Sequence, residues 1–431
     1  MKTLYPKQQE AADFFINCLR NDQNTLDTSD VGTGKTIVAS YIAKQLGRPV
    51  AVICPKAVIP SWQRELAEFG IEPIFVLNYE KLRTGRTPHM SKRGKKIMQW
   101  NLPDDTLVLV DECHKAKSPY TLNAQLLISL VQQWYSVHMM SATASQDPTE
   151  MRAIGFALGL HGLNKSDAPL LNWYSWMVKY GCAKNEWNQW QLRRASKLRE
   201  LHNTMYGRNA KRLTVSDFPD SFKENRIFVE PIAFGNQAKI IKAYKDAGIT
   251  PEIIEQLIEN GTVEDSEYVL VNLLKARQLV EAFKVKDIVE MAQDLSDSGK
   301  NVVIFCNFRE SIDMICAQLG CAGIYGGQSA VARQQAIDDF QADKTHILAV
   351  NTAAGGTGIS LHDVGGERER VSLISPSFSA KDHLQALGRI HRNGAKSHAV
   401  QKILVASGSI EEKVIEAIDK KLANMGKLHY A

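Results

Sequence analysis

The residues of this chain with the clearest chemical signature are Ser29–Thr36, a glycine-rich segment that reads Ser-Asp-Val-Gly-Thr-Gly-Lys-Thr. A glycine-rich turn that leads into a helix exposes backbone N–H groups to phosphate oxygens. Gly32, Thr33 and Gly34 would bring the backbone close to a bound triphosphate. Lys35 would reach the β- and γ-phosphates and Thr36 would bind Mg²⁺. The segment therefore predicts a site for ATP and Mg²⁺.

A second segment, Leu107–His114, joins an apolar run to two adjacent carboxylates. At the end of a strand, Asp111 would hold Mg²⁺ through water, and Glu112 would orient and deprotonate the attacking water. Met139–Ala144 also ends an apolar run with small hydroxyl residues. These could link the carboxylates to a nucleic-acid side of the protein.

Two arginines, Arg389 and Arg392, are three positions apart in Gln385–Arg392, and on a helix they would point the same way. Guanidinium groups neutralise the charge that builds up on a transferring γ-phosphoryl group. We predict catalytic roles for Lys35, Asp111, Glu112, Gln385, Arg389 and Arg392.

The elements that must position these residues follow from short β-branched runs, which are typical of parallel strands covered on both faces. The runs are Val50–Ile53, Ile74–Leu77, Leu107–Val110, Val137–Met140, Val302–Phe305, Ile347–Val350 and Val371–Ile374. They alternate with helical stretches, which predicts an α/β fold with two parallel sheets. We expect helical segments at about 150–212 and 235–295, a turn at Asn260–Gly261, and a loop at Thr84–Lys96.

Length and composition agree with two domains. A chain of 431 residues is too long to form one core. Its hydrophobic fraction of 44% is typical of a soluble globular protein. We place the domain boundary near residue 228. Residues 1–228 hold 30 Lys and Arg against 21 Asp and Glu, whereas residues 229–431 hold 22 against 26. A basic first half suits a polyanionic partner, although chance asymmetry explains it equally well.

Other classes of protein are disfavoured. No apolar run approaches the length of a membrane span, and the N-terminus lacks the apolar stretch of a signal peptide. The seven cysteines are scattered without a CxxC pair, which argues for a reducing compartment and against a structural zinc site. We expect the cytoplasm of a bacterium or virus-infected cell, or the nucleus in a eukaryote. Trp173, Trp176, Trp187 and Trp190 could stack on bases, but their spacing favours core packing.

Taken in order, these motifs resemble the superfamily-two helicases, and within them the Swi/Snf-type DNA translocases. The resemblance covers nearly the whole chain. Its further motifs are Leu4–Gln8, Pro55–Trp62, Asp111–Lys117, Arg208–Pro219, Asn301–Phe308, Thr352–Leu361, Gln385–Gly394 and Ser409–Lys413. Ser360 stands where the family usually has Asn, and Gly365–Arg370 looks like a small hairpin-like addition.

The resemblance implies two RecA-like lobes, residues 1–228 and 229–431, with a helical insertion after the core of the first. It implies that Gln8 reads adenine and that Gly358 belongs to the ATP site. Nucleic acid, double-stranded or branched DNA, would cross both lobes. The expected contacts are Lys56, Arg86, Lys92, Arg93 and Thr352, although the basic run between Lys81 and Lys96 is equally typical of a solvated face. A strand-separating DNA or RNA helicase and a non-catalytic nucleic-acid-binding module remain alternatives.

Overall fold

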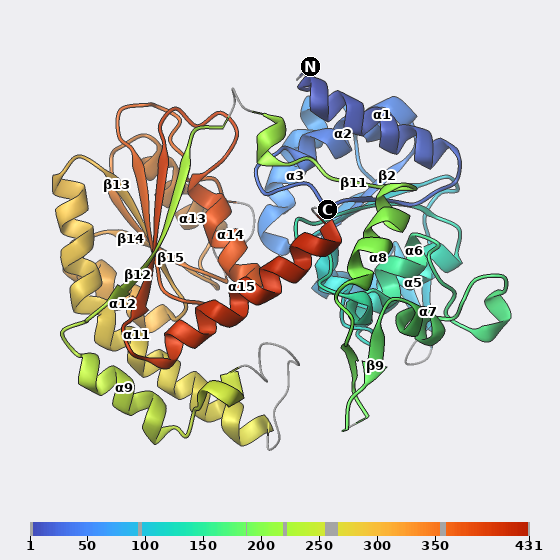
Figure 1. The fold of residues 1–431 in the computed structure, drawn as a ribbon. Helices are drawn as coiled ribbons and strands as arrows, with labels where there is room; N and C mark the ends of the chain where they lie inside the picture. Colours follow the sequence, from blue (N-terminus) through green and yellow to red (C-terminus); the bar gives the residue numbers. More distant parts are fainter. Residues whose placement is uncertain are drawn as a thin grey trace. The chain divides into compact units, whose positions relative to one another are not determined.

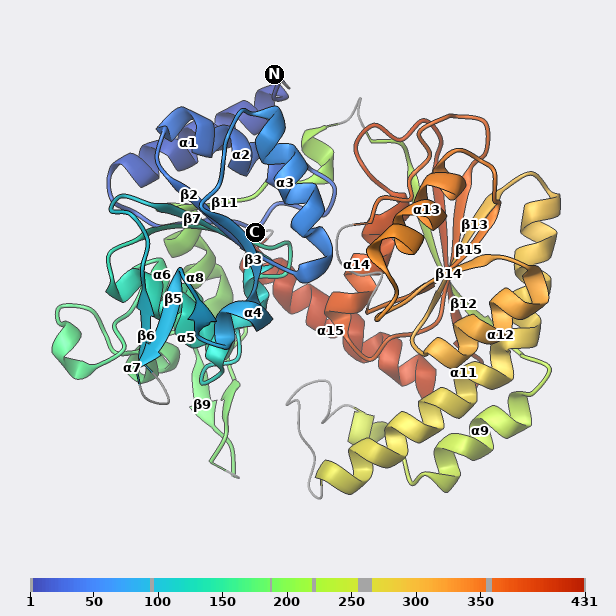
Figure 2. The same cartoon turned by 180° about the vertical axis from the view of Figure 1, so that it is seen from behind.

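Two parallel β-sheets organise the fold, one in each half of the chain (Figures 1 and 2). The computed structural model describes residues 3–93, 97–186, 188–218, 222–254, 266–353 and 359–429. The chain divides into unit 1, which runs to Asp217 and includes the C-terminal residues from Ala423 on, and unit 2, which comprises Phe218–Leu422. Residue 228 lies inside a strand of unit 2.

The sheet of unit 1 contains the four strands expected in the first half of the chain. All of its pairings are parallel. In spatial order it consists of β11 (Ala210–Lys211), β1 (Thr25–Asp27), β8 (Ser136–Met140), β7 (Leu107–Asp111), β2 (Val50–Cys54) and β3 (Phe75–Asn78). The short strands β1 and β11 escaped prediction because two or three residues give no periodicity.

Helices cover both faces of this sheet. Figures 1 and 2 show α1 (Pro6–Arg20), α2 (Lys35–Leu46) and α3 (Ile59–Glu68) on one face. The other face carries α5 (Leu122–Gln132), α6 (Arg152–Ala157) and α8 (Lys197–Tyr206). Two further helices are α4 (Tyr79–Arg83) and α7 (Trp173–Lys179). Single 3₁₀ turns occur at Lys56–Val58, Cys113–Ala116, Pro148–Glu150, Lys165–Asp167 and Val215–Asp217.

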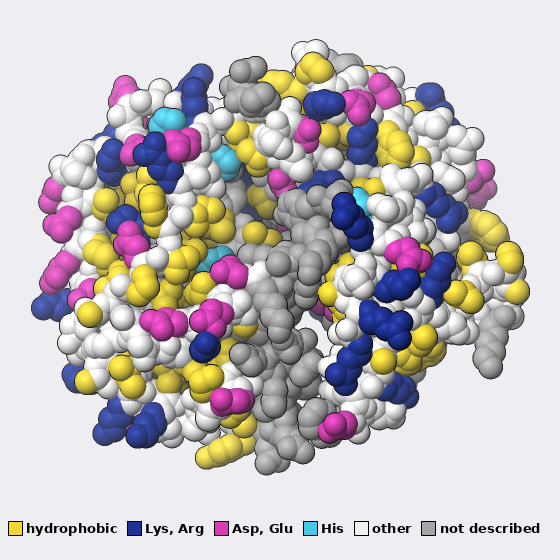
Figure 3. Space-filling view, viewed as in Figure 1, with side chains coloured by type: hydrophobic (Ala, Val, Ile, Leu, Met, Phe, Trp, Pro, Cys, Tyr) yellow, Lys and Arg dark blue, Asp and Glu magenta, His cyan; other side chains and the backbone are white. Residues whose placement is uncertain are grey.

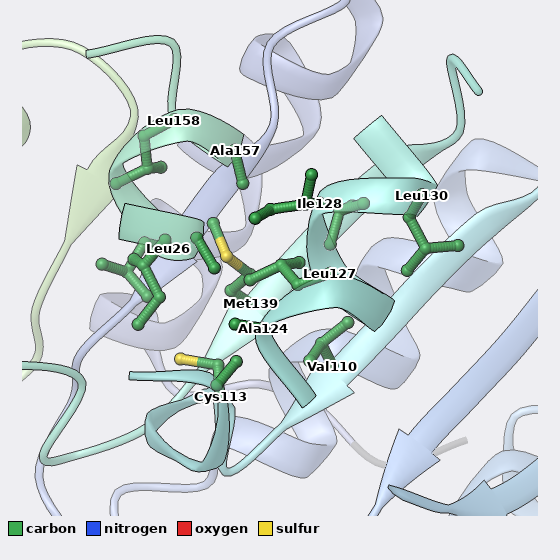
Figure 4. Close-up of a cluster of buried hydrophobic side chains, with 14 of the residues drawn as sticks. Leu26, Val110, Cys113, Ala124, Leu127, Ile128, Leu130, Met139, Ala157 and Leu158 are labelled. Carbon is green, nitrogen blue, oxygen red and sulfur yellow. The ribbon is translucent and has the colours of Figure 1, made fainter. Parts of the chain in front are cut away.

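The hydrophobic core of unit 1 lies between the sheet and α5. Figure 4 shows Leu26, Val110 and Met139 from three neighbouring strands facing Leu127 and Ile128 of α5. All of these side chains are buried. Burial of this kind stabilises the fold by about 25 cal/mol per Å² of apolar surface. The packed core therefore holds the three strands, and the site residues at their ends, in position.

The loop expected at Thr84–Lys96 is wrong. The structure has a three-stranded antiparallel sheet of β4 (Arg86–Thr87), β5 (Met90–Arg93) and β6 (Ile97–Trp100). Met90 pairs with Trp100, and both side chains are buried together with Met98. These buried side chains therefore hold the small sheet in place, although the composition of the segment is that of a basic loop. Gly94–Lys96 lie outside the described residues.

The segment 150–212 is only partly helical. Besides α6, α7 and α8 it holds an antiparallel hairpin of β9 (Cys182–Lys184) and β10 (Trp190–Leu192). Trp173 and Trp176 are buried in the core, which confirms the packing interpretation for them. Trp190 is half-buried and lies in strand β10, so the helix that its spacing suggested is wrong. Trp187 lies outside the described residues.

The sheet of unit 2 contains the three remaining expected strands, again with parallel pairings throughout. Its spatial order is β12 (Asn225–Ile232), β17 (Ala399–Ala406), β16 (Arg370–Ile374), β13 (Asn301–Cys306), β15 (Ile347–Asn351) and β14 (Ala322–Ile324). The α/β class with two parallel sheets is confirmed.

Side chains of the central strand β13 alternate between two cores. Val302 and Ile304 pack toward α9 (Gln237–Asp246), α11 (Ser266–Asp297), α12 (Arg309–Leu319) and α15 (Ile410–His429). Val303 and Phe305 pack toward α13 (Ala330–Gln341) and α14 (Ala380–Ile390). Figures 1 and 2 show α11 and α12 on the face of the sheet opposite α13 and α14. This period of two is what buried strands require.

The helices expected at 235–295 are confirmed by α9 and α11, and the turn expected at Asn260–Gly261 lies outside the described residues. The hairpin expected at Gly365–Arg370 is wrong. Oδ1 of Asp363 accepts hydrogen bonds from the backbone N–H groups of Gly365 and Gly366, which makes a turn, and Arg370 is the first residue of β16.

All seven cysteines are free thiols. Across the described parts of the chain, none of the helices combines the length and apolar character needed to cross a bilayer.

Candidate functional site

The predicted phosphate loop connects β1 to α2. Gly34 forms the N-cap of α2 with a φ of 93°, and Gly32 has a φ of 87°. Such left-handed values favour glycine, and they turn the backbone sharply into the helix. Nζ of Lys35 donates to the carbonyl oxygens of Ser29 at 2.7 Å and of Asp30 at 2.9 Å. The loop is therefore wrapped around its own lysine.

Gln8 lies directly beside this loop. Its Nε2 donates to the Thr33 carbonyl at 2.7 Å, and its Oε1 accepts from the backbone N–H of Tyr5 at 3.0 Å. A Cβ atom at Gly34 would lie 2.5 Å from the same Nε2. The sequence placed Gln8 with the nucleotide only through resemblance, and the structure brings it to the phosphate loop from α1.

Asp27 is a residue of this site that the sequence did not single out. It ends β1, is 1% exposed, and accepts a hydrogen bond from the Ser29 N–H at 2.8 Å. Burial raises the pKa of Asp27, and Lys35 opposes this rise. Burial lowers the pKa of Lys35, against the charges of Asp27, Glu112 and Asp111. The lysine therefore sits within the field of three carboxyl groups.

Arg212, also unpredicted, closes the loop from the far end of unit 1. It forms an ion pair with Asp30 and donates to the Thr28 carbonyl at 2.8 Å. The backbone N–H of Val215 donates to the other oxygen of Asp30 at 3.0 Å. No local sequence pattern could reveal this contact, because the partners are separated by most of unit 1.

The acidic pair follows β7 at the same edge of the sheet. Parallel strands bring their carboxyl ends together, and β1, β8 and β7 are neighbours. In register, Met140 of β8 lies between Asp27 and Asp111. The predicted carboxylates therefore reach the phosphate loop across a single strand.

Asp111 is held on two sides by aromatic residues. Nε1 of Trp62 donates to its Oδ2 at 2.9 Å, and the hydroxyl of Tyr79 donates to its backbone carbonyl at 2.7 Å. Burial and the charge of Glu112 raise the pKa of Asp111 to about 6, whereas the Trp62 hydrogen bond lowers it. Trp62 is 1% exposed, so within Pro55–Trp62 it supports the acidic site rather than nucleic acid.

Glu112 takes a left-handed backbone conformation with a φ of 51°. Its carboxylate lies 3.0 Å from Nδ1 of His114, which in turn lies 2.9 Å from Oγ of Ser141. Ser141 follows β8 within the predicted Met139–Ala144 segment. The structure thus joins that segment to the acidic pair through a buried histidine.

The arginines of unit 2 converge on one carbonyl. Nη1 of Arg389 donates to the Ile359 carbonyl at 3.2 Å, and Nη2 of Arg392 donates to the same oxygen at 3.0 Å. The expectation that both lie on one helix is wrong, because α14 ends at Ile390 and His391 is extended. They meet through the turn after the helix instead. Burial lowers the pKa of Arg392 to about 10.

Of the other residues expected in unit 2, two are buried and one lies outside the described residues. Gln385 lies in α14 and is buried. Thr352 is 2% exposed, and its hydroxyl donates to the Cys306 carbonyl at 3.0 Å. The structure therefore does not place this hydroxyl where nucleic acid could reach it. Gly358 lies outside the described residues.

The expected nucleic-acid contacts in unit 1 lie on two features. Lys56 is exposed at the start of the turn after β2. Arg86 is exposed in β4, and Lys92 in β5 packs its stem against Gly85. Arg93 ends β5, and its side chain lies outside the described part of the structure. The small sheet, rather than a loop, carries Arg86 and Lys92.

Comparison with known proteins finds one family model and several relatives. Residues 283–394 match the helicase conserved C-terminal domain. A protein of Acanthamoeba polyphaga mimivirus named "Putative ATP-dependent RNA helicase" is 30% identical over 99% of this chain and 83% of its own length. A Xenopus tropicalis protein named as a SWI/SNF-related regulator of chromatin is 23% identical over 98% of this chain and 45% of its own length.

Among solved structures, the Sulfolobus solfataricus SWI2/SNF2 ATPase core in complex with dsDNA matches 99% of this chain and 94% of that chain. It has 18% identity and a TM-score of 0.40. The viral relative, aligned along almost the whole chain, is the comparison that establishes kinship. The chain belongs to the Swi/Snf-type helicases of superfamily two, enzymes that use ATP.

Proposed function

We propose that this enzyme hydrolyses ATP to move along double-stranded DNA, including forks, branched DNA and DNA that carries bound proteins. One observation carries the proposal. The loop after β1 and the end of β7 bring Lys35, Asp111 and Glu112 to one edge of the sheet of unit 1, and Arg389 and Arg392 meet at one carbonyl in unit 2. A ligand drives motion when it binds two conformations of a protein with different affinities, and ATP would act on this enzyme in that way.

Within this proposal each residue has a role. Lys35 binds the β- and γ-phosphates with the backbone of Gly32, Thr33 and Gly34, and Gln8 reads adenine. Glu112 deprotonates the attacking water. Arg389 and Arg392 neutralise charge on the γ-phosphoryl group, Gln385 shares in catalysis, and Gly358 contributes to ATP binding.

Thr36 and Asp111 would hold Mg²⁺. Mg²⁺ prefers oxygen ligands, and it is bound through one or two carboxylates with substrate phosphates. The environment of Asp111 fits such an ion, because burial and the neighbouring Glu112 raise its pKa to about 6. A cation beside it would offset that cost. When bound, Mg²⁺ would neutralise phosphate charge, while Trp62 keeps the Asp111 carboxylate in place.

Nucleic acid would be held through its phosphates by Lys56, Arg86, Lys92 and Arg93, at the surface of unit 1. Such contacts carry no sequence information and weaken steeply with salt. The enzyme would act wherever its DNA lies, in the cytoplasm of a bacterium or virus-infected cell or in a nucleus.

A strand-separating helicase, on RNA or DNA, is the second candidate. The name of the mimivirus relative favours it, since that protein is named as an RNA helicase. The two candidates differ in what stimulates ATP hydrolysis and in what is displaced.

The test measures ATP hydrolysis with single-stranded DNA, duplex DNA, a fork, a four-way junction and RNA. Triplex displacement and forked-duplex unwinding are run beside it. The proposal expects duplex or branched DNA to stimulate most and the triplex strand to be displaced. Stimulation by RNA alone, or unwinding without triplex displacement, would replace it with the second candidate.

A further inference from the structure

A pocket of about 640 Å³ lies in unit 1, apart from the residues of the ATP site. Its size is within the range of sites for small organic groups. It is lined by Lys117, Ser118, Pro119, Tyr120, Thr149, Glu150, Trp173, Tyr174, Lys184, Asn188 and Trp190. Four aromatic rings in one such pocket call for a ligand that aromatic surfaces recognise.

The aromatic rings form a connected wall. The centroids of Trp173 and Tyr174 lie 5.1 Å apart, and those of Tyr174 and Trp190 lie 5.9 Å apart with the ring planes at 33°. The hydroxyl of Tyr174 lies 2.5 Å from that of Tyr120. Tyr174 is 46% exposed and Tyr120 is 67% exposed, so both offer ring surface to a ligand. Contiguous exposed apolar patches, unlike single exposed residues, often mark ligand-binding or interaction sites.

The charges around this wall favour an anionic partner. Nζ of Lys184 lies 5.8 Å from the centroid of Trp190, and the guanidinium of Arg152 lies 5.2 Å from that of Tyr120. Lys117 forms a 2.6 Å ion pair with Glu150, the acidic residue of the lining. A cationic ligand of the aromatic-cage type would meet these three cations. A ligand with a flat ring and a phosphate group would stack on the aromatic wall and be attracted by the cations around it.

The surface near the pocket has the same character. Figure 3 shows Lys and Arg side chains gathered over α8 and the hairpin of β9 and β10. Exposed basic residues of these elements and of the segment between them are Lys184, Arg193, Arg194 and Arg199. A polyanionic strand that enters the pocket would therefore find a basic path beside it.

We propose that this pocket binds an unpaired base of a single nucleic-acid strand, stacked on Trp190 and Tyr174, with the adjoining phosphate beside Lys184. The inference rests on the proposed function and deepens it, because it makes an unpaired strand, as at a fork or junction, part of the substrate. Base stacking on aromatic side chains tolerates any sequence, as a translocase requires.

The pocket also touches both segments that leave the ATP site. Glu150 pairs with Lys117, the last residue of Asp111–Lys117, and accepts from the backbone N–H of Gln146 at 2.9 Å. Gln146 follows the Met139–Ala144 segment that carries Ser141. A strand whose phosphate competes for Lys117 would alter a contact shared by both segments, which gives the ATP site a route for sensing the strand.

The test measures binding of fluorescein-labelled oligothymidylate and oligouridylate to the full chain. Trp190→Ala is expected to weaken oligothymidylate binding about tenfold or more. Trp190→Phe is expected to restore most of it. The matched control is Trp134→Ala, since Trp134 is 92% exposed and does not line the pocket. Tyr174→Ala, with its more exposed ring, serves if Trp190→Ala fails to fold.

Wild-type affinity in both Trp190→Ala and a folded Tyr174→Ala would overturn the proposal. So would tryptophan fluorescence that responds to a polyglutamate peptide but not to oligothymidylate, which would assign the pocket to a protein partner. Stimulation of wild-type ATP hydrolysis by duplex DNA tests the proposed function separately. Either result can fail without the other.

Discussion

The Glu112 carboxylate lies 3.0 Å from Nδ1 of His114, and this contact fixes a glutamate whose backbone is in the left-handed region. A non-glycine residue in that region costs about 1–2 kcal/mol relative to the right-handed one. Strain of this kind persists where the surroundings hold it, and it is frequent at active sites. The same histidine nitrogen lies 2.9 Å from Ser141, so the contact also joins the ends of β7 and β8.

Glu112→Gln keeps the shape of this side chain and removes its ability to take a proton. We expect ATP turnover to fall about 10²- to 10⁴-fold, the usual contribution of general acid–base catalysis. ATP binding should persist, which a fluorescent ATP analogue would report. Glu80→Gln, at an acidic residue outside the site, is the control. Near-normal turnover in Glu112→Gln would refute the assignment of Glu112 as the base.

Lys35→Ala should abolish ATP turnover by removing the cation around which the phosphate loop is wrapped. Here the loss should appear in ATP binding as well, unlike Glu112→Gln. Lys44→Ala is the matched control, because Lys44 is exposed in the last turn of the same helix. Equal ATP affinity in Lys35→Ala and Lys44→Ala would mean that the loop does not hold the triphosphate.

Gly34→Ala should damage the ATP site more than the fold. At Gly34 a Cβ atom would lie 2.5 Å from Nε2 of Gln8, and the φ of 93° is already unfavourable for alanine. Displacing Gln8 breaks its hydrogen bond to the Thr33 carbonyl, a contact worth about 1 kcal/mol, so we expect ATP to bind more weakly.

The control is Gly47→Ala at the other end of α2, where φ is 65° and nothing lies within 4 Å of the added Cβ. It should lower the melting temperature through backbone strain of about 1–2 kcal/mol and leave ATP affinity unchanged. Equal ATP affinities in the two variants would contradict a role for the Gln8 contact.

The raised pKa of Asp111 predicts loss of activity in mild acid. Only the ionised carboxyl can hold Mg²⁺, so kcat/KM for ATP should fall as the pH drops through about 6. Excess Mg²⁺ should move this limb to lower pH, since a cation favours the charged form. Trp62→Phe removes a hydrogen bond that lowers the pKa, so it should move the limb to higher pH.

The sign of the linked stability separates this effect from acid unfolding. Because the native pKa lies above the ordinary value of 3.8, the native state binds this proton more tightly than the unfolded state. Protonation of Asp111 therefore favours the fold as the pH falls between about 6 and 4. Circular dichroism should stay native where activity is lost, and coincident loss of both signals would contradict the assignment.

Much of this arrangement could be predicted from the sequence where the signal is local. Buried parallel strands are continuous apolar runs, and Leu107–Asp111 or Asn301–Cys306 can be read directly from such runs. The phosphate loop and acidic pair follow strands, so their meeting at one edge comes from topology alone. Short strands such as Thr25–Asp27 lack the length that gives a period.

What the sequence could not give is contact between distant residues. Trp62 binds Asp111, and Arg212 binds Asp30, through packing of elements far apart in the chain. The basic composition of Thr84–Lys96 concealed Met90, whose burial against Trp100 makes that segment a sheet. The end of α14 before Arg392 was likewise invisible, because no glycine or proline stops the helix at His391.

The Ser409–Lys413 signature has a structural role that yields the last prediction. Glu411 forms an ion pair with Lys284 of α11, and both side chains are nearly inaccessible. Glu411 also accepts from the Ala406 N–H at 2.8 Å, so it ties α15 to β17 and α11. Removing one partner leaves a buried charge without its counterion, which typically costs about 3–5 kcal/mol.

We therefore expect Lys284→Met and Glu411→Gln each to lower the free energy of unfolding in urea by about that amount. The double variant should recover part of the loss, because replacing a whole buried pair is often neutral. Lys286→Met is the control, since Lys286 is 80% exposed on the same helix. Additive losses in the double variant would show that the two charges do not depend on each other, and would leave this signature without the structural role assigned to Glu411.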